Sequence, residues 1–317
     1  MRVAVVGTGG VAQRHLGVFP RIGGLEVVGH LSQDLSRASA QAQAWGGRAY
    51  THLDRLLDHE QPEAVWVCVT PDRHGAIEAA LIDRGIPFFV EKPLSVDLAT
   101  AEAIAAALAQ RPVLAAVGYR FRALDTLPRV RALLAERPAR MVIGAWHDAM
   151  PPPAWWRDAT RGGGQIVEQV THLVDLARLL VGEAQVVSAS GGRWPRADYP
   201  DSTVADVSAA HLRFVESGVP GLLSATCLLD GQQAIWLQLI CEGRVLTISE
   251  RALRIDTGRQ VEDIPTAADP FEVEDAAFLR AIRHADPSAI LCSYADALQT
   301  HALCWQIQAR MNTAAVG

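Results

Sequence analysis

The sequence RVAVVGTGGVA occupies residues 2–12. Residues 2–6 form a short apolar run that is typical of a buried strand, and an alternating apolar pattern continues after the glycines to Leu16. The glycines have the spacing G-x-G-x-x-A, in which the first glycine allows a tight turn and the second lets the backbone approach a pyrophosphate. Alanine at the last position still lets helix and strand pack closely. We therefore expect a dinucleotide-binding turn with phosphates at a helix N-terminus, formed by Gly7, Gly9, Gly10, Val11 and Ala12. A glycine turn without a ligand is the alternative.

The end of the second expected strand, residues 26–31, indicates which dinucleotide binds. Ser32 occupies the position where an acid would hydrogen-bond the ribose 2′-hydroxyl of NAD. Arg37 follows one turn into the next helix, and a hydroxyl with a guanidinium suits a 2′-phosphate. This pair favours NADP. In the alternative, Asp34 reaches the ribose, Arg37 is a solvated helix charge, and the cofactor is NAD.

Composition excludes several classes of protein. The 317 residues can bury a large core and predict two domains, while a net charge of −6 without a Lys/Arg-rich run argues against a nucleic-acid partner. The apolar runs are too short to span a membrane, and the N-terminus resembles a strand rather than a signal peptide. The five cysteines are scattered without a C-x-x-C pair, so we expect reduced thiols in a cytoplasmic protein.

Strands and helices alternate through residues 1–120. We expect strands at 2–6, 26–31, 49–50, 64–69, 87–90 and 113–117, with helices at 11–19, 35–45, 52–58, 72–84 and 96–109. Such alternation predicts an α/β Rossmann domain with a doubly wound parallel sheet, and ligands then bind outside the carboxyl ends of the strands.

The pattern changes after Tyr119, so we expect a second domain over residues 121–317. After a helix at 126–136 come strands with two-residue alternation, at 141–146, 204–215, 221–229, 234–241, 245–249 and 253–256. They predict a large, mostly antiparallel open sheet with helices on one face, chiefly residues 166–180, and helices at 272–284 and 293–311 close the chain. The other face of such a sheet needs cover, so we expect a homo-oligomer, a dimer or tetramer, formed through this sheet.

Glu91-Lys92-Pro93 directly follows the buried run at 87–90. Proline fixes its own φ and biases the residue before it toward an extended conformation, which gives the Lys92 side chain a defined direction toward a substrate oxygen. The Lys92–Pro93 peptide bond can also be cis. The alternative is an exposed salt bridge of Glu91 at the strand end.

A second cluster of polar residues follows the glycines at 162–164. In the expected helix, Glu168 and His172 are four residues apart and project from one face, with Asp175 three residues further on. A histidine beside carboxylates, which raise its pKa, can act as a general base. Glu168 and His172 could also supply two ligands of a metal site. No third ligand follows at a spacing typical of such sites, so we expect no metal. A hydrogen-bonded core histidine is the third possibility.

With these three motifs in this order, essentially the whole chain resembles the Gfo/Idh/MocA oxidoreductases. The resemblance implies that Lys92 is the essential substrate and proton-relay residue and that His172 is the acid/base. The position four before that histidine usually carries an aspartate that binds a substrate hydroxyl and orients the histidine; here it is Glu168, one methylene longer. The resemblance further implies hydride transfer between NAD(P) and a sugar, a polyol or a related carbinol or carbonyl compound, and Ser32 with Arg37 is similar to the pair in NADP-using members.

The remaining candidate residues follow from their places in the chain. Family members often place substrate-pocket residues just before the glycines, here Trp155, Trp156 and Arg157, although core anchors are an equal alternative for the tryptophans. Tyr119 is a further substrate-pocket candidate, and cofactor contacts are expected from Thr70, Pro71, His74, Glu91 and Lys92.

The same motifs leave rival functions open. These are a reductase of another carbonyl, imine or tetrapyrrole, a nucleotide-sensing regulator and, more weakly, a metal-dependent enzyme.

Overall fold

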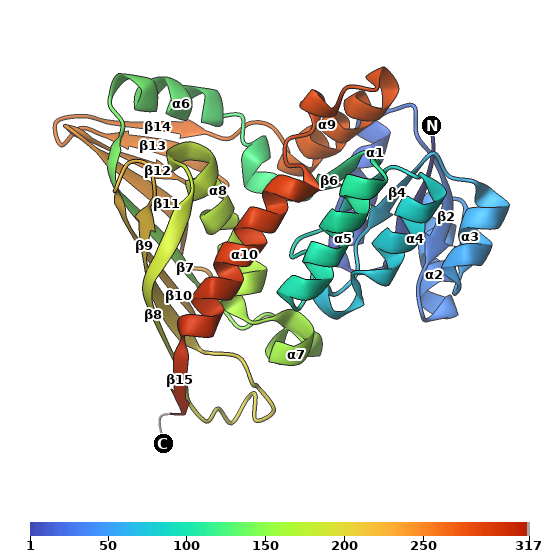
Figure 1. The fold of residues 1–317 in the computed structure, drawn as a ribbon, viewed down its shortest axis with the longest axis horizontal. Coiled ribbons are helices and arrows are strands. Elements are labelled where there is room, and N and C mark those ends of the chain that lie inside the picture. Colours follow the sequence, from blue (N-terminus) through green and yellow to red (C-terminus); the bar gives the residue numbers. More distant parts are fainter. Residues whose placement is uncertain (316–317) are drawn as a thin grey trace. The chain divides into compact units, whose positions relative to one another are not determined.

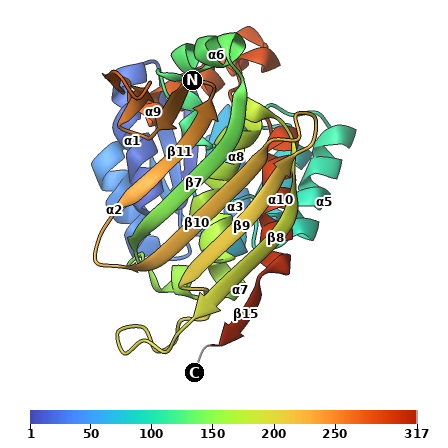
Figure 2. The same cartoon turned by 90° about the vertical axis from the view of Figure 1, so that its left-hand side faces the viewer.

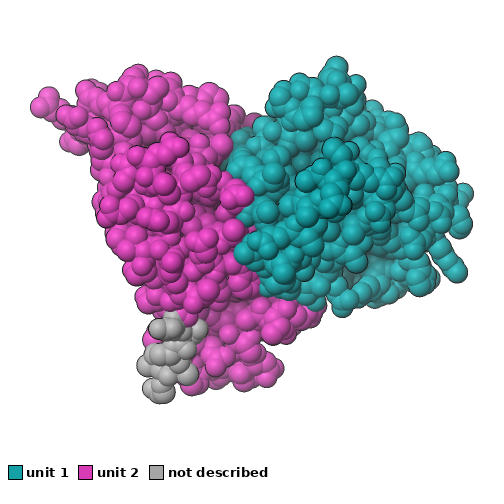
Figure 3. All heavy atoms as spheres, in the orientation of Figure 1, with its two compact units in different colours: residues 1–123, 269–298 teal, residues 124–268, 299–317 magenta. Residues whose placement is uncertain are grey.

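The computed structural model describes residues 1–315, with side chains through residue 311. Its contacts divide the chain into two compact units (Figure 3). The first holds residues 1–123 and 269–298, and the second holds residues 124–268 and the chain from residue 299 onward. The expected continuous split into 1–120 and 121–317 therefore differs from these units in two segments, the boundary residues 121–123 and the longer stretch 269–298, both of which belong to the first unit.

The first unit contains a six-stranded parallel sheet in the order β3-β2-β1-β4-β5-β6. Figure 1 labels three of its strands, β2, β4 and β6, among the helices of this unit. Its strands are β1 (Arg2–Val6), β2 (Glu26–Leu31), β3 (Arg48–Tyr50), β4 (Ala64–Val67), β5 (Phe88–Val90) and β6 (Ala115–Val117). Between them lie α1 (Gly10–Ile22), α2 (Leu35–Trp45), α3 (Leu53–Glu60), α4 (Ala76–Arg84) and α5 (Leu98–Gln110). The strand order reverses between β1 and β4, where doubly wound sheets bind their ligands. The expected Rossmann fold is confirmed.

Both faces of this sheet are buried, as the alternation along β1 shows. Ala4 and Val6 belong to one core cluster, while Val3 and Val5 belong to another. The second cluster includes Phe278 of α9 (Pro270–His284), whose ring meets Trp66 of β4 edge to face at 5.3 Å. This packing is the physical reason that residues 269–298 join the first unit, because the apolar side of α9 is buried against this sheet.

The expected helix at 72–84 is wrong at its start. A 3₁₀ turn spans Pro71–Arg73, and α4 begins only at Ala76. Gly75, with φ 106°, separates the two, and a Cβ at this position would lie 2.8 Å from Thr100 Cγ2. A residue with positive φ cannot continue a right-handed helix, so the helix restarts after it.

The second unit contains a nine-stranded sheet in the order β14-β13-β12-β11-β7-β10-β9-β8-β15. The strands are β7 (Ala139–Ala149), β8 (Ala184–Arg193), β9 (Val207–Phe214), β10 (Pro220–Leu229), β11 (Ala234–Cys241), β12 (Arg244–Ile248), β13 (Ala252–Asp256), β14 (Val261–Pro265) and β15 (Asn312–Ala315). Only the β7–β10 and β8–β15 pairs are parallel, so the expected mostly antiparallel sheet is confirmed. We did not expect β8, β14 or β15 from the sequence.

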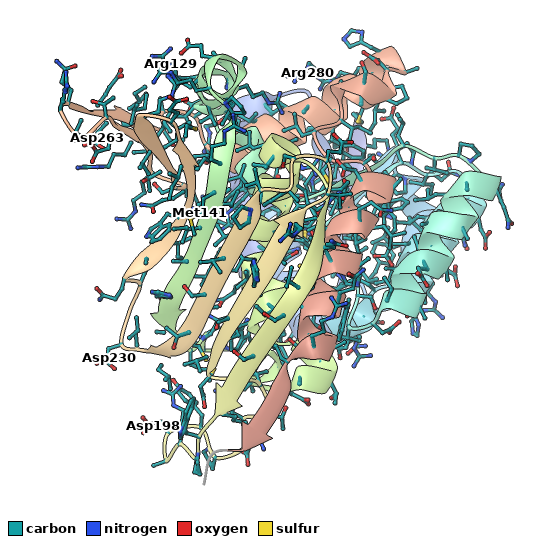
Figure 4. All side chains as sticks on the ribbon, turned by 60° about the vertical axis from the view of Figure 1, so that its left-hand side comes forward. Arg129, Met141, Asp198, Asp230, Asp263 and Arg280 are labelled. Carbon is teal, nitrogen blue, oxygen red and sulfur yellow. The ribbon has the colours of Figure 1, made fainter. Side chains whose placement is uncertain are left out.

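The two faces of the second sheet differ. Helix α8 (Thr171–Val181) packs on one face (Figure 2). On that face, a Cβ at Gly144 of β7 would lie 2.5 Å from Leu223 and 3.5 Å from Leu173 of α8. Leu222 points the other way and is 43% exposed. Figure 4 shows the side chains that stand on this open face, with Met141 of β7 among them. The other α-helices of the described residues are α6 (Leu127–Glu136), the short α7 (Ala159–Gly162) and α10 (Tyr294–Arg310).

The five cysteines are free and buried, as expected for reduced thiols. Within the described residues, the helices lack the combination of length and apolarity that crossing a bilayer requires.

Candidate cofactor and catalytic sites

The glycine turn between β1 and α1 has the backbone that a dinucleotide site needs. Gly7 adopts φ 110°, and a Cβ there would lie 2.0 Å from the backbone oxygen of Cys68, so only glycine fits. A Cβ at Gly9 or Gly10 would meet no protein heavy atom within 4 Å, so at these positions the backbone itself faces open space. Ala12 is buried in the sheet-facing core. The turn therefore leaves room for a pyrophosphate beside the N-terminal amides of α1.

Ser32 and Arg37 meet at this turn. The Thr8 hydroxyl donates to Ser32 Oγ at 3.4 Å, and Arg37 Nη2 donates to the Thr8 backbone oxygen at 3.2 Å. Asp34 instead caps α2, because its carboxylate accepts from the backbone N–H of Ser36 at 2.8 Å and from the Ser36 hydroxyl. These hydrogen bonds, that of the Ser36 hydroxyl first, lower the pKa of Asp34. The carboxylate that the NAD alternative requires is therefore engaged in a helix cap.

The loop after β4 carries Thr70, Pro71 and His74. The Thr70 hydroxyl donates to the carboxylate of Asp72, and Pro71 opens the 3₁₀ turn. His74 is buried, with Nδ1 2.6 Å from Glu78 Oε1, while Glu78 Oε2 accepts from the backbone N–H of Gly75. His74 Nε2 is buried without a hydrogen-bond partner among the described residues. Nδ1 of His74 thus contacts the carboxylate of Glu78, which caps the start of α4.

Glu91, Lys92 and Pro93 follow the carboxyl end of β5, and the Lys92–Pro93 bond is cis. Glu91 is buried, and its Oε1 lies 3.0 Å from Nε2 of His15 on α1. Glu91 Oε2 accepts from the Lys92 backbone N–H at 3.2 Å. The alternative of an exposed strand-end salt bridge is therefore wrong. Lys92 is half-buried, and it is the one lysine in the 317-residue sequence.

In the second unit, the helix expected at 166–180 is irregular at its start. Gly163 and Gly164 adopt φ 77° and 86°, residues Ile166–Val170 form a π-helical turn, and α8 begins at Thr171. The Gln165 side chain anchors this start by donating to the backbone oxygen of Thr226 in β10. The spacing of Glu168 and His172 is therefore not that of one regular α-helix, and such π turns are frequent at functional sites.

Trp156 and Glu168 are brought together, which no spacing in the sequence indicates. The 3₁₀ turn Ala154–Arg157 buries the Trp156 ring, and its Nε1 donates to Glu168 Oε2 at 2.7 Å. Trp155 is partly buried, and the guanidinium of Arg157 lies over the Tyr199 ring at 5.0 Å. Trp156 is thus a buried anchor whose indole N–H also holds the Glu168 carboxylate.

His172 is 1% exposed, and its ring is stacked against Trp146 of β7, with centroids 6.0 Å apart and planes at 16°. Asp175, three residues later, is buried and accepts from the Thr300 hydroxyl of α10 at 2.9 Å; Thr300 in turn accepts from Arg178 Nη1. The hydrogen bond between Asp175 and Thr300 therefore helps to hold α8 against α10. Within the described residues, the triplet with metal-ligand geometry is His15, Glu91 and Glu274, which includes neither Glu168 nor His172.

Tyr119 is buried in the first unit, where it joins the core cluster that contains Val6 and Val90. Its backbone N–H donates to the Val117 oxygen just after β6. The residue therefore has a clear packing role.

Comparisons with known proteins match both units. Residues 1–119 match the family model described as "Oxidoreductase family, NAD-binding Rossmann fold", and residues 138–247 match the "GFO/IDH/MocA C-terminal domain". The chain is 24% identical over 297 residues to a 4-carboxy-2-hydroxymuconate-6-semialdehyde dehydrogenase from Sphingobium sp., covering 89% of this chain and 90% of that protein. It is 26% identical over 277 residues to a D-apiose dehydrogenase from Paraburkholderia graminis, covering 82% and 68%.

Solved structures share the fold along the whole chain. A 3-ketoreductase from Actinomadura kijaniata, solved with NADP and TDP-benzene, aligns with a TM-score of 0.85 at 19% identity, covering 100% of this chain and 99% of that one. A UDP-N-acetylglucosamine 3-dehydrogenase from Acidithiobacillus ferrooxidans aligns with a TM-score of 0.83 at 22% identity, covering 98% and 97%. With two family models covering both units, the chain belongs to the Gfo/Idh/MocA family of NAD(P)-binding oxidoreductases.

Proposed function

We propose that this protein is an NADP-dependent dehydrogenase or reductase that acts on a CH–OH or C=O group of a sugar, a polyol or a related small molecule. The observation that carries the proposal lies in the first unit. The glycine turn after β1 and the Glu91-Lys92-Pro93 motif after β5 lie at the same edge of one parallel sheet, next to its switch point. The bound nicotinamide accepts or supplies the hydride, while the protein orients and polarises the substrate.

The choice of NADP rests on charge. Arg37 and Ser32 meet at Thr8, and no acid stands at the Ser32 position. A guanidinium binds a 2′-phosphate through charge-assisted hydrogen bonds, whereas a carboxylate would repel it. Asp34, the carboxylate that would compete for a 2′-hydroxyl, is engaged in capping α2, which supports the choice of NADP.

Lys92 is proposed to hydrogen-bond the substrate oxygen and to stabilise the alkoxide that develops as a proton leaves. An ammonium group supplies both the donor and the charge for this. The buried Glu91 carboxylate holds the Lys92 amide, so the base of this side chain is fixed. This hydrogen bond from the Lys92 amide to Glu91 supports the proposed role of Lys92, because that role requires the side chain to be held in one place.

His172 is proposed to take the substrate hydroxyl proton during oxidation, with Glu168 orienting it and binding a second hydroxyl. The stacking on Trp146 fixes the plane of the imidazole, and the Trp156 hydrogen bond fixes the Glu168 carboxylate. A general base must be held in one orientation to accept a proton efficiently. Trp155, Arg157 and Tyr119 remain candidate substrate-pocket residues.

The substrate class rests on relatives. D-Apiose dehydrogenase and inositol 2-dehydrogenase, the latter 35% identical over 102 residues in Leifsonia xyli, act by name on a sugar and a polyol. The semialdehyde dehydrogenase of Sphingobium sp. leaves a carboxylated carbonyl compound as the second candidate. A regulator that senses the nucleotide without turnover is less well supported, because Lys92 and His172 are both present.

We further propose a cytoplasmic homo-oligomer. The five buried free thiols suit a reducing compartment. A second copy of the chain would cover the open face of the nine-stranded sheet, where Leu222 and Leu228 are 43% and 41% exposed.

The test follows nicotinamide absorbance with NADP⁺ or NAD⁺ against a panel of sugars, anhydrosugars, inositols and hydroxy-acid semialdehydes. Lys92→Ala should abolish turnover, whereas Lys92→Arg keeps the charge but changes the donor geometry and serves as the matched variant. Because the chain has one lysine, reductive methylation of the wild type should also inactivate it by modifying one side chain besides the N-terminus. Turnover that survives both treatments would contradict the proposed role of Lys92.

A further inference from the structure

A buried histidine links three elements of the first unit. His15 Nδ1 lies 2.9 Å from both carboxylate oxygens of Asp275 on α9, and its Nε2 lies 3.0 Å from Oε1 of Glu91 after β5. Trp66 Nε1 also donates to Asp275, at 2.8 Å. His15 and Asp275 are fully buried, and Glu91 is nearly so. Each ring nitrogen of His15 therefore faces a carboxylate, an arrangement that suits the doubly donating imidazolium.

The charges around the ring support that protonation state. Burial opposes a charge on His15, but Asp275 first and then Glu91 outweigh it and raise its pKa well above 6.5. Burial, followed by the negative charge of Glu91, raises the pKa of Glu274 well above its usual value. Burial also raises the pKa of Asp275, against the attraction of His15. The ionisable groups that face this cluster are Asp275 and Glu274 of α9, Glu91, Cys68 and Arg120.

The cluster continues to the lysine motif through Glu91. Its Oε1 contacts His15, and its Oε2 accepts from the Lys92 backbone N–H. On the other side, a Cβ at Gly118 would lie 2.7 Å from Glu91 Oε1, so the carboxylate is closely packed there as well. An unbroken series of contacts thus runs from α9 through α1 to the Lys92 amide, and α1 is the helix that begins at the glycine turn.

We propose that His15 is a positioning residue: it fixes the Glu91 carboxylate, which holds the Lys92 amide, and thereby couples the place of Lys92 to the helix that receives the cofactor phosphates. The proposal rests on the proposed function of Lys92. The consequence is that His15, whose ring bonds to Asp275 and Glu91, controls turnover more than cofactor affinity.

Two amide substitutions separate this role from simple packing. In His15→Gln the amide nitrogen replaces Nε2, so it keeps the contact to Glu91 and loses the contact to Asp275. In His15→Asn the amide nitrogen replaces Nδ1, so it keeps the contact to Asp275 and loses the contact to Glu91. Both variants remove the same charge from the same buried position, which makes each the control for the other.

The link itself is measured by hydrogen exchange at the Lys92 amide, resolved from overlapping peptides by mass spectrometry, with and without NADP⁺. We expect faster exchange in His15→Asn and near wild-type exchange in His15→Gln. In turnover, kcat should fall about tenfold to a hundredfold in His15→Asn, with the Kd for NADP⁺ within about threefold of wild type. The His15→Gln variant should keep most of the wild-type kcat, because it keeps the contact to Glu91.

Equal losses in the two variants, or a His15→Asn variant with wild-type exchange and kcat, would overturn the proposal. So would a stoichiometric divalent metal in the purified protein, because ligand atoms of His15, Glu91 and Glu274 lie within 4.8 Å of one another and Nε2 would then be a ligand. We expect no such metal.

Gly118→Ala tests the same carboxylate from the opposite side if His15→Asn fails to fold. The three atoms nearest to the added methyl all belong to the Glu91 carboxyl group, so the substitution should displace Glu91 and also speed exchange at the Lys92 amide. Unchanged exchange in this variant would contradict the proposal. A wild type that turns over no substrate would remove the proposed function, while the exchange measurements would still decide whether the link exists.

Discussion

At the scale of single residues, the two glycines of the dinucleotide turn have different tasks. A Cβ at Gly7 would collide with the backbone of residue 68, whereas a Cβ at Gly9 would meet no protein atom within 4 Å. Gly7→Ala should therefore destabilise the fold by about 1–3 kcal/mol or more, because it adds a clash to a positive φ. Urea unfolding measures this.

Gly9→Ala is the matched control, since its backbone is extended and the added methyl enters only the open space where we propose that the pyrophosphate binds. We expect its unfolding midpoint to stay near the wild type and its Kd for NADP⁺ to rise at least about tenfold, which is about 1.4 kcal/mol. A Gly9→Ala protein that binds the cofactor normally would show that the phosphates lie elsewhere.

Trp156 and Glu168 form the second residue-scale test. Trp156→Phe keeps the buried ring but removes the donor to Glu168 Oε2, and Glu168→Asp withdraws the carboxylate by one methylene. Each single change should lower kcat, by roughly tenfold if the carboxylate orients His172. The double variant should be little worse than either single variant, because both break the same contact. Additive losses would mean that the two residues act separately.

At the scale of elements, we propose that the connection from β2 to α2 sets the preference for NADP over NAD. Arg37→Ala should weaken NADP⁺ binding by about tenfold to a hundredfold and leave NAD⁺ binding within about threefold, since only the 2′-phosphate needs the guanidinium. Ser32→Asp should add repulsion to the phosphate and supply an acceptor for a 2′-hydroxyl. Fluorescence titration with both dinucleotides measures the ratio, and a ratio unchanged by both substitutions would favour NAD as the cofactor.

The elements also show where periodicity misleads. The pattern from Ile166 to Leu180 predicts one helix, but the glycines at 163 and 164 and the side-chain anchor of Gln165 produce a π turn before α8. A π turn adds one residue to a turn without changing which side chains are apolar, so the sequence contains no signal for it. Strand β8 lacked a signal for another reason, because its small residues do not alternate clearly in polarity.

At the scale of the whole molecule, the open face of the nine-stranded sheet predicts self-association. Leu222→Asp with Leu228→Asp places two charges on this face, and it should shift the protein toward the monomer in sedimentation or light-scattering measurements. Val215→Asp is the control, because Val215 is 61% exposed but lies in the turn after β9. A wild type that is monomeric at all concentrations would remove the oligomer proposal.

The pH dependence of stability follows from the buried cluster. His15 and Glu274 both have raised pKa values in the folded state, so the fold binds their protons more tightly than the unfolded chain does. The contribution of His15 is complete below about pH 6.5 and is lost as the pH rises through its folded pKa. Stability should therefore fall with rising pH in this window, by up to about 1.4 kcal/mol per pH unit for one proton.

Urea unfolding between pH 6.5 and pH 9 measures this slope, and His15→Gln should reduce it because an amide does not titrate. A wild-type slope that His15→Gln leaves unchanged would show that other groups control it.

The sequence by itself determined the Rossmann sheet, the place of the glycine turn, the lysine motif and the mostly antiparallel second sheet. These features depend on local order: a buried strand before glycines, a proline after a lysine, and two-residue alternation along strands. The tertiary structure decided the pairings that local order cannot carry. His15 meets Asp275 across 260 positions of sequence, Trp156 meets Glu168 through a 3₁₀ turn, and α9 packs on the sheet of the first unit. Such contacts arise when distant elements bury polar groups together, and each buried group must then find a partner that sequence spacing does not reveal.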